Sequence, residues 1–129
     1  SYVNLSGPVV RKVAEDLEVS VGDMLIVLDD FYLPTGSLRL RKAGGDGGHN
    51  GLDSIIRAFK TDRINRLRIG IGVPHPGGAK DHVLSRFRPE ERQVIEEAIR
   101  TAADAATVWA VEGPELAMTR FNRTSPEEK

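Results

Sequence analysis

The chain has 129 residues, of which 40% are hydrophobic and 29% are charged, and its formal net charge is −1. A chain of this length suits a single domain, and no apolar run approaches the roughly 20 residues that cross a bilayer, so we expect one domain and no membrane segment. The absence of cysteine excludes disulfides and thiolate zinc sites, and the near-zero net charge leaves nucleic-acid binding to local basic patches.

The first part of the chain predicts a helix followed by a strand. Apolar residues recur at helical spacing over residues 7–18, with Ser6 as the expected N-cap, so this stretch predicts an amphipathic helix. The continuous apolar run of residues 24–28 is typical of a strand buried on both faces. Asp29 then falls at the carboxyl end of that strand, where α/β proteins place functional side chains. A turn or cap carboxylate is an equally good interpretation of this residue.

The next predicted strand carries positive charge on one face. Residues 37–42 alternate leucine with Arg39 and Arg41, so one face is apolar and the other basic. Arg68, on a later predicted strand, is a candidate for the same surface. Together the three arginines form a candidate phosphate-binding patch, and the alternative is an ordinary solvated face that discourages aggregation.

Glycine-rich sequence at residues 44–51 predicts a loop. Helical periodicity resumes over residues 52–59, so His49 and Asn50 fall at a helix N-terminus. There they can cap the helix, hold an anion or polarise a carbonyl, and capping is the commoner role for asparagine. The loop has neither the Lys-Ser/Thr ending of a P-loop nor the glycine spacing of a dinucleotide site, which disfavours a nucleotide site.

The second half of the chain predicts one more strand and two helices. Residues 66–72 alternate apolar residues with small or basic ones, as a strand does. After a proline-rich loop at residues 74–78, a long helix is expected over 89–113, followed by a short helix over 116–121. The polar stretch 123–129 is expected to fray.

Strands that alternate with helices predict an α/β domain with a mixed, largely parallel sheet flanked by helices, occupying residues 1–129. Three strands are few for a sheet covered on both faces, and the chain opens at Ser1 without a methionine, so we expect the domain to be incomplete. His75 and His82 lack the paired spacing of a metal site, and we expect both to be solvated.

Four segments share their order along the chain with the motifs of a known family. They read Tyr-Val-Asn-Leu-Ser-Gly at 2–7, Leu-Asp-Asp-Phe-Tyr-Leu-Pro-Thr-Gly at 28–36, Gly-Gly-Asp-Gly-Gly-His-Asn-Gly-Leu at 44–52 and Arg-Leu-Arg-Ile-Gly-Ile-Gly at 66–72. These segments resemble motifs of the bacterial-type peptidyl-tRNA hydrolases, enzymes that cleave the ester bond between a peptide and its transfer RNA. The resemblance runs from Ser1 to about Asn122.

The resemblance implies a role for each matching residue. Asn4 and Asn50 would bind the peptidyl part or position the attacked carbonyl and water. Asp29 would orient a catalytic histidine, while His49 and Gly47 would lie along the substrate cleft near the acceptor end of the tRNA. The basic residues that the family offers to tRNA phosphates are matched by Arg39, Arg41 and Arg68.

This sequence also departs from the family pattern. Val3 replaces the usual methionine, Leu28 replaces a frequent histidine, and Asp46 adds a negative charge to the glycine loop. The family begins with a segment resembling Gly-Leu-Gly-Asn-Pro-Gly, followed by a Thr-Arg-His-Asn motif that supplies the catalytic histidine, and neither motif occurs in this chain. The resemblance therefore implies the C-terminal two-thirds of the domain, without its N-terminal strands. His49 belongs to the other His-Asn motif and is not the missing base.

In the whole enzyme the resemblance implies that the histidine takes a proton from water, that Asp29 stabilises the imidazolium, and that amide donors stabilise the oxyanion. No metal or cofactor is needed for this chemistry. We expect such an enzyme to recycle peptidyl-tRNA in translation and ribosome rescue, in the cytoplasm, as a monomer that binds no membrane and no metal. This chain alone is expected to be inactive. The alternatives are a non-catalytic RNA-binding relative and a truncated product without independent function.

Overall fold

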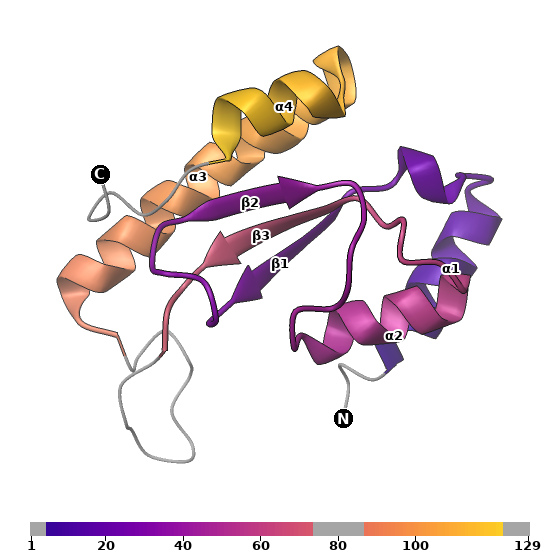
Figure 1. Ribbon diagram of the computed structural model, residues 1–129, viewed down its shortest axis with the longest axis horizontal. Coiled ribbons are helices and arrows are strands. Elements are labelled where there is room, and N and C mark those ends of the chain that lie inside the picture. The colour runs from indigo at the N-terminus through magenta and orange to yellow at the C-terminus, as the bar shows by residue number, and fades with distance from the viewer. Residues whose placement is uncertain (1–4, 74–86, 123–129) are drawn as a thin grey trace. The chain divides into compact units, whose positions relative to one another are not determined.

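The computed structural model of the chain describes residues 5–73 and 87–122. These residues contain four α-helices, one 3-10 helix and a three-stranded sheet (Figure 1). The helices are α1 (Ser6–Asp16), η2 (Val21–Asp23), α2 (Asn50–Phe59), α3 (Pro89–Glu112) and α4 (Pro114–Phe121), and the strands are β1 (Ile26–Asp30), β2 (Leu38–Arg41) and β3 (Arg66–Gly70). The predictions that fall outside the described residues concern Val3, Asn4, the loop at 74–78, His75, His82 and the tail at 123–129.

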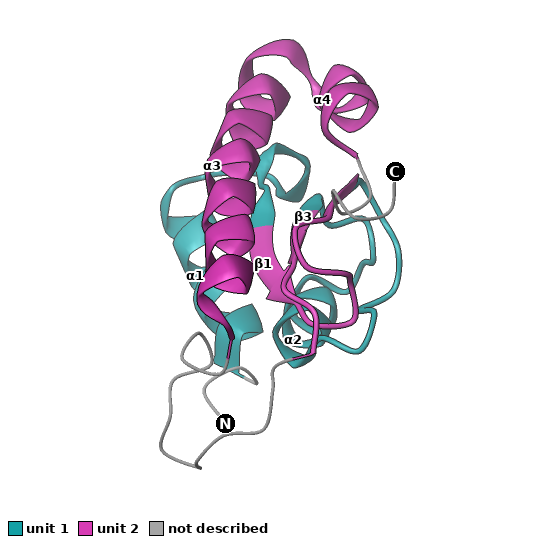
Figure 2. Ribbon diagram, turned by 90° about the vertical axis from the view of Figure 1, so that its left-hand side faces the viewer, with its two compact units in different colours: residues 1–26, 41–66 teal, residues 27–40, 67–129 magenta. Residues whose placement is uncertain are grey.

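The chain divides into two compact units (Figure 2). Unit 1 combines residues 1–26 and 41–66, and unit 2 combines residues 27–40 and 67–129. Unit 1 therefore contains α1, η2 and α2, whereas unit 2 contains α3, α4 and most of each strand. The single domain expected over residues 1–129 stays a prediction.

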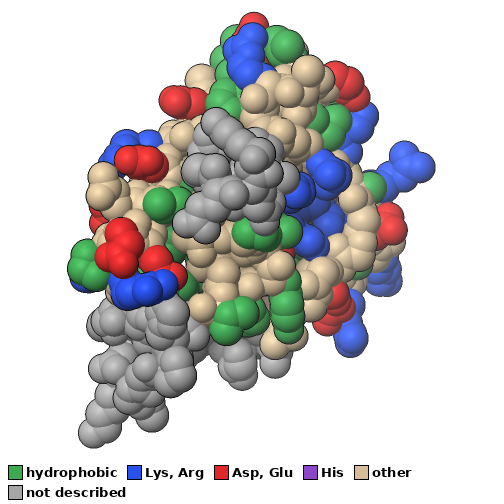
Figure 3. Space-filling model, turned by 60° about the vertical axis from the view of Figure 1, so that its left-hand side comes forward, with side chains coloured by type: hydrophobic (Ala, Val, Ile, Leu, Met, Phe, Trp, Pro, Cys, Tyr) green, Lys and Arg blue, Asp and Glu red, His purple; other side chains and the backbone are tan. Residues whose placement is uncertain are grey.

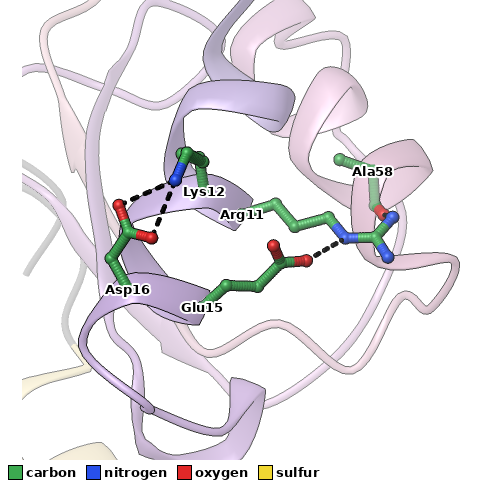
Figure 4. Close-up of polar contacts among 5 residues, drawn as sticks. All are labelled: Arg11, Lys12, Glu15, Asp16 and Ala58. Atoms are coloured by element: carbon green, nitrogen blue, oxygen red, sulfur yellow. Dashed lines mark hydrogen bonds and ion pairs between the residues drawn. The ribbon is translucent and has the colours of Figure 1, made fainter.

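Unit 1 is built on the close packing of α1 against α2. The Gly7 N–H donates a hydrogen bond to Ser54 Oγ at 2.8 Å. A Cβ atom at Gly7 would meet the Ser54 carbonyl oxygen at 2.0 Å, so this approach of the two helices requires glycine. Arg11 Nη1 adds a hydrogen bond to the Ala58 carbonyl at 2.9 Å (Figure 4). The glycine of the Asn-Leu-Ser-Gly segment therefore has a packing role.

The predicted helix of unit 1 is confirmed as α1, but its N-cap and its buried face differ from the prediction. Its N-cap is Leu5, and Ser6 is already helical. The buried residues of α1 are Gly7 and Ala14, and at Gly7 the closeness of α2 leaves no space for a side chain. The apolar stripe lies on the exposed side and consists of Leu5, Val9, Val13 and Leu17. Exposed i,i+4 ion pairs accompany it (Figure 4): Arg11 with Glu15 and Lys12 with Asp16.

The sheet has the strand order β1-β3-β2. In Figure 1 the arrows of β1 and β3 point the same way, and that of β2 points the opposite way. Hydrogen bonds agree: the Ile71 N–H donates to the Asp30 carbonyl just beyond the parallel pair, and Gly36 and Gly70 are joined across the antiparallel pair. The predicted α/β arrangement with a mixed sheet is confirmed, with one parallel and one antiparallel pairing in the described part.

β1 differs from its prediction in position and in burial. It runs over Ile26–Asp30 instead of residues 24–28, and its burial alternates along the strand. Val27 and Asp29 are exposed, whereas Leu28 and Asp30 are buried. Only the face that carries Leu28 and Asp30 is buried, so the prediction of burial on both faces is wrong. That description fits the central strand β3, whose residues are buried on both faces apart from the half-buried Arg68.

The basic strand and the core of unit 2 follow the sequence pattern. In β2, Leu38 and Leu40 are buried, Arg39 is half-buried and Arg41 is exposed. The α4 helix packs against α3, and the Asn122 side chain, just after α4, exchanges hydrogen bonds with both backbone groups of Leu40. An asparagine side chain thus occupies the outer edge of β2 at this residue. The buried residues that α3 contributes are Ile95, Ala98, Ala102 and Ala105.

Candidate functional site

Two neighbouring carboxylates end β1, and their surroundings differ. Asp29 is exposed, and its side chain makes no hydrogen bond or ion pair with a described residue. Asp30 points to the other face and is only 3% exposed. Its Oδ1 accepts a hydrogen bond from the Tyr32 N–H at 2.8 Å, and its Oδ2 lies 3.6 Å from Arg68 Nη1. Asp30 therefore shapes the end of the strand, whereas the Asp29 side chain is exposed and makes no such contact with a described residue.

The three candidate arginines lie in different surroundings. Arg68 is largely buried beside Asp30, whose charge offsets its own. Arg39 is half-buried and donates from Nη1 to the Leu38 carbonyl at 3.1 Å, whereas Arg41 is exposed at the end of β2. On the face drawn in Figure 3, Lys and Arg side chains occur together with Asp and Glu side chains. Exposure therefore makes Arg41 the best placed of the three to contact a phosphate.

The glycine loop is folded on itself by Asp46. The Asp46 Oδ1 accepts a hydrogen bond from the Gly48 N–H at 2.8 Å, and its carbonyl accepts from the His49 N–H at 3.0 Å. This is an Asx-turn, in which an aspartate side chain mimics a backbone acceptor. Gly47 is exposed in the turn, with φ +60°. The residue that departs from the family pattern thus has a structural role in the loop.

His49 is the N-cap of α2, which is one of the roles that the sequence left open for His49 and Asn50. Its Nδ1 accepts a hydrogen bond from the Leu52 N–H at 3.1 Å. A ring nitrogen that accepts carries no proton, so the neutral ring holds its proton on Nε2. Asn50 is the first residue of α2; it is exposed, and its side chain makes no hydrogen bond with a described residue. The helix start therefore presents an asparagine amide beside an imidazole donor.

Arg66, at the start of β3, was not singled out as a site residue from the sequence. It is 2% exposed. Its guanidinium donates to four backbone carbonyls, those of Ile64 at 2.6 Å, Gly45 at 2.9 Å, Gly44 at 3.0 Å and Asp62 at 3.1 Å. The sequence offered one signal for it, because a loop so rich in glycine has carbonyls that need donors from elsewhere in the chain.

Unit 1 brings together three of the sequence-predicted residues, Gly47, His49 and Asn50, in one loop and helix start. In unit 2, Arg68 pairs with Asp30 and so lies on the opposite face of β1 from Asp29. The predicted residues that lie outside the described part of the chain are Val3 and Asn4.

Other features of the described residues do not add to this group. A hollow of about 350 Å³ in unit 1 is lined by Pro8, Asp53, Ser54, Arg57 and Ala58, none of which is a predicted site residue. Within the described ranges, no three His, Cys, Asp or Glu side chains are grouped so that they could hold a metal ion. No helix in the same ranges has the length and apolar character needed to cross a membrane.

Comparison with known proteins decides the family. The family model for peptidyl-tRNA hydrolases matches residues 1–129, the whole chain. The chain belongs to the peptidyl-tRNA hydrolase family. The peptidyl-tRNA hydrolase of Chlorobaculum parvum is 45% identical over 126 residues, covering 96% of this chain and 66% of the relative. That of Carboxydothermus hydrogenoformans is 43% identical over 123 residues, covering 95% and 66%.

The fold agrees with this family. The crystal structure of peptidyl-tRNA hydrolase from Acinetobacter baumannii superposes on the chain with a TM-score of 0.80 at 32% identity, covering 98% of this chain and 64% of that one. The family resemblance drawn from the four motifs is confirmed. The chain spans about two thirds of the length of the curated relatives it matches.

Proposed function

We propose that this chain forms part of an enzyme that hydrolyses the ester bond between a peptide and tRNA. The observation that supports it most is the match of the whole chain to the hydrolase family. Two of the polar residues that match the family motifs, Asp29 and Asn50, are exposed, and their side chains make no hydrogen bond with a described residue. Both are residues for which the motifs imply a part in the reaction.

Asp29 is proposed to orient a histidine and to stabilise its charged form. An exposed carboxylate can accept a hydrogen bond from one imidazole nitrogen and so fix the tautomer in which the other nitrogen takes a proton from water. Asp30 is unsuited to this role, because its oxygens already face the Tyr32 amide and Arg68. Of the two adjacent acids, Asp29 is therefore assigned to the reaction and Asp30 to the structure of the strand end.

Asn50 and the start of α2 are proposed to bind the acyl group. The amide of Asn50 has two N–H donors that can approach a carbonyl oxygen, and the charge that develops on that oxygen during attack is stabilised by donors placed in advance. His49 adds a donor at Nε2. It is unsuited to be the general base, because Nδ1 accepts the Leu52 amide and Nε2 carries the proton.

A base must therefore come from outside the groups described here, and the family motif that carries it does not occur in this sequence. We expect the 129-residue chain alone to show no hydrolysis of peptidyl-tRNA. Joining to Ser1 a segment from a related hydrolase that contains Gly-Asn-Pro-Gly and Arg-His-Asn should restore it. The assay measures release of peptide from peptidyl-tRNA by the chimera.

The matched control is the same chimera with the grafted histidine replaced by alanine, which should be inactive while folding equally well. Appreciable turnover by the ungrafted chain would show that the base assignment is wrong. A folded chimera that binds tRNA but stays inactive would favour the non-catalytic RNA-binding alternative, with Val3, Leu28 or Asp46 as the residues to revert first.

A further inference from the structure

We propose that Arg66 is a positioning residue that sets the glycine loop carrying His49 and Asn50. This inference rests on the proposed function, because its consequence for catalysis depends on Asn50 contacting the substrate. Arg66 does not itself reach a substrate, since it is 2% exposed. Its effect passes through the backbone to which it donates.

The contacts of Arg66 join two stretches of unit 1 that are separate in sequence. Nη1 and Nη2 donate to the carbonyls of Gly45 and Gly44, where the loop begins. Nη2 and Nε also donate to the carbonyls of Asp62 and Ile64, in the connection from α2 to β3. A backbone hydrogen bond from the Gly44 N–H to the Asp62 carbonyl, at 3.1 Å, completes the junction. The start of the loop is thereby fixed to the start of β3.

Only arginine has the geometry for this junction. The guanidinium presents its donors in a rigid planar fork, so one group can serve several carbonyls that converge from different directions. A lysine would bring the same charge and three donors, but from a single nitrogen, and could not reach the same set of acceptors. The guanidinium and Ile64 are buried, whereas Gly44, Gly45 and Asp62 are partly or fully exposed, so loop carbonyls that lose their donor would turn toward water.

The far end of the loop is held by contacts of its own, which begin only a few residues after Gly44, so a shift at the start of the loop would reach them. Asp46 accepts from the amides of Gly48 and His49, and His49 caps α2 through Leu52. The loop is therefore held by Arg66 at its start and by the helix at its end. Gly44 itself has φ +134°, a backbone conformation that residues with a Cβ rarely adopt, so the start of the loop requires glycine at this position.

A loop held at both ends presents Asn50 in one direction before the substrate arrives. Catalysis by hydrogen-bond donors depends on such preorganisation, and a displacement of about 1 Å can lower the rate roughly 100-fold. Arg66 is thus expected to affect substrate binding and turnover through the position of Asn50, while the fold of α2 stays the same.

The experiment compares Arg66→Lys with Arg63→Lys in the chain as it is. Arg63 is an exposed arginine in the same connection and serves as the matched control. Amide hydrogen exchange is measured by NMR, together with the ¹⁵N shifts of the His49 ring, which report whether Nδ1 still accepts the hydrogen bond from the Leu52 N–H. Arg66→Lys should speed exchange at Gly44, Gly48 and His49 by about tenfold or more, with the later amides of α2 unchanged, and Arg63→Lys should change nothing.

A second arm tests the consequence for substrate. The probe is an N-acetylaminoacyl adenosine in which an amide replaces the ester, titrated into the chain. Arg66→Lys should weaken its binding about tenfold or more if Asn50 contacts the acyl group. Failure of the unaltered chain to bind the probe would count against the proposed function, and the exchange data would still decide the role of Arg66. Unchanged exchange and His49 shifts in a folded Arg66→Lys variant would overturn the inference.

If Arg66→Lys does not fold, Gly44→Ala tests the junction from its other side. The new side chain disfavours φ +134° while Arg66 remains in place, so the same loop amides and the Arg66 Nε–H should exchange faster. Gly45→Ala is the matched control, because a Cβ there meets no atom within 4 Å. Equal protection of the loop in both alanine variants would overturn the inference.

Discussion

The backbone of the glycine loop in unit 1 and that of the end of β1 in unit 2 are each held by a buried charged residue, but the two residues make different interactions. Each region exposes a polar side chain, Asn50 in the loop and Asp29 on the strand, and each has a buried charged residue that holds the adjacent backbone. In unit 1 that anchor is Arg66, which donates to neutral carbonyls. In unit 2 it is Asp30, which accepts from a backbone amide and faces Arg68.

Because the two anchors make different interactions, we expect their replacement to destabilise the protein in different ways. Replacing an anchor that donates to neutral carbonyls removes hydrogen bonds, and the stability lost depends on how many carbonyls are left without a donor. An anchor in an ion pair also leaves a partly buried charge on its partner. The exposed neighbours, Asn50 and Asp29, lack either role, so replacing them should affect chemistry more than stability.

The largest effect on stability is expected from Arg66→Met. Met keeps the apolar stem but removes all four donor contacts. Each lost hydrogen bond is worth about 1 kcal/mol net, so the free energy of unfolding should fall by about 3–4 kcal/mol. Urea denaturation measures this. Arg63→Met, at an exposed position, should change the unfolding free energy by less than about 0.5 kcal/mol. Similar losses for both variants would mean that the carbonyl contacts of Arg66 add nothing specific.

The two carboxylates of β1 should separate stability from catalysis. Asp30→Asn keeps an acceptor for the Tyr32 amide but removes the charge that faces Arg68, and should lower the unfolding free energy by about 2 kcal/mol. Asp29→Asn should leave stability nearly unchanged. In the chimera it should lower kcat more than it raises KM, because the carboxylate stabilises charge that appears only during the reaction. An unchanged kcat would remove Asp29 from the mechanism.

Differences among the arginines should appear in the salt dependence of tRNA binding by the chimera. Arg41→Ala, and Arg39→Ala to the extent that Arg39 reaches a phosphate, should each lower the slope of log K against log salt by roughly 1. Arg68→Gln should lower it less, because Asp30 already offsets its charge. A reduction of roughly 1 with Arg68→Gln would show that Arg68 leaves Asp30 to contact a phosphate, as the motif resemblance implies.

Local patterns predicted the elements whose burial follows from their own sequence. The alternation of leucine and arginine placed β2 and its basic face, and Pro89 and Gly113 bounded α3 because they restrict the backbone locally. The capping role of His49 was one of the alternatives that its place before a helical pattern left open. These predictions succeeded because the determining interactions lie within a few residues of one another.

The predictions that failed depended on contacts between distant segments. The apolar stripe of α1 suggested a buried face, but the helix contact with α2 uses Gly7 and Ser54, 47 positions apart. The run at residues 24–28 suggested a strand buried on both faces, whereas one face of β1, with Val27 and Asp29, is exposed because no described segment covers it. The anchoring of the loop by Arg66, 21 positions after Gly45, has no local signature either.

The smallest effect is expected at Asp46, whose charge and acceptor can be separated. Asp46→Asn keeps Oδ1 as an acceptor for the Gly48 N–H, so the unfolding free energy should change by less than about 0.5 kcal/mol. Asp46→Ala removes the acceptor and should cost about 1 kcal/mol, the usual net value of one hydrogen bond. Asp46→Asn should also strengthen tRNA binding by the chimera slightly at low salt, because a negative charge near the proposed acceptor-end path is lost. Equal destabilisation by both substitutions would show that the charge of Asp46, and not its acceptor oxygen, holds the turn.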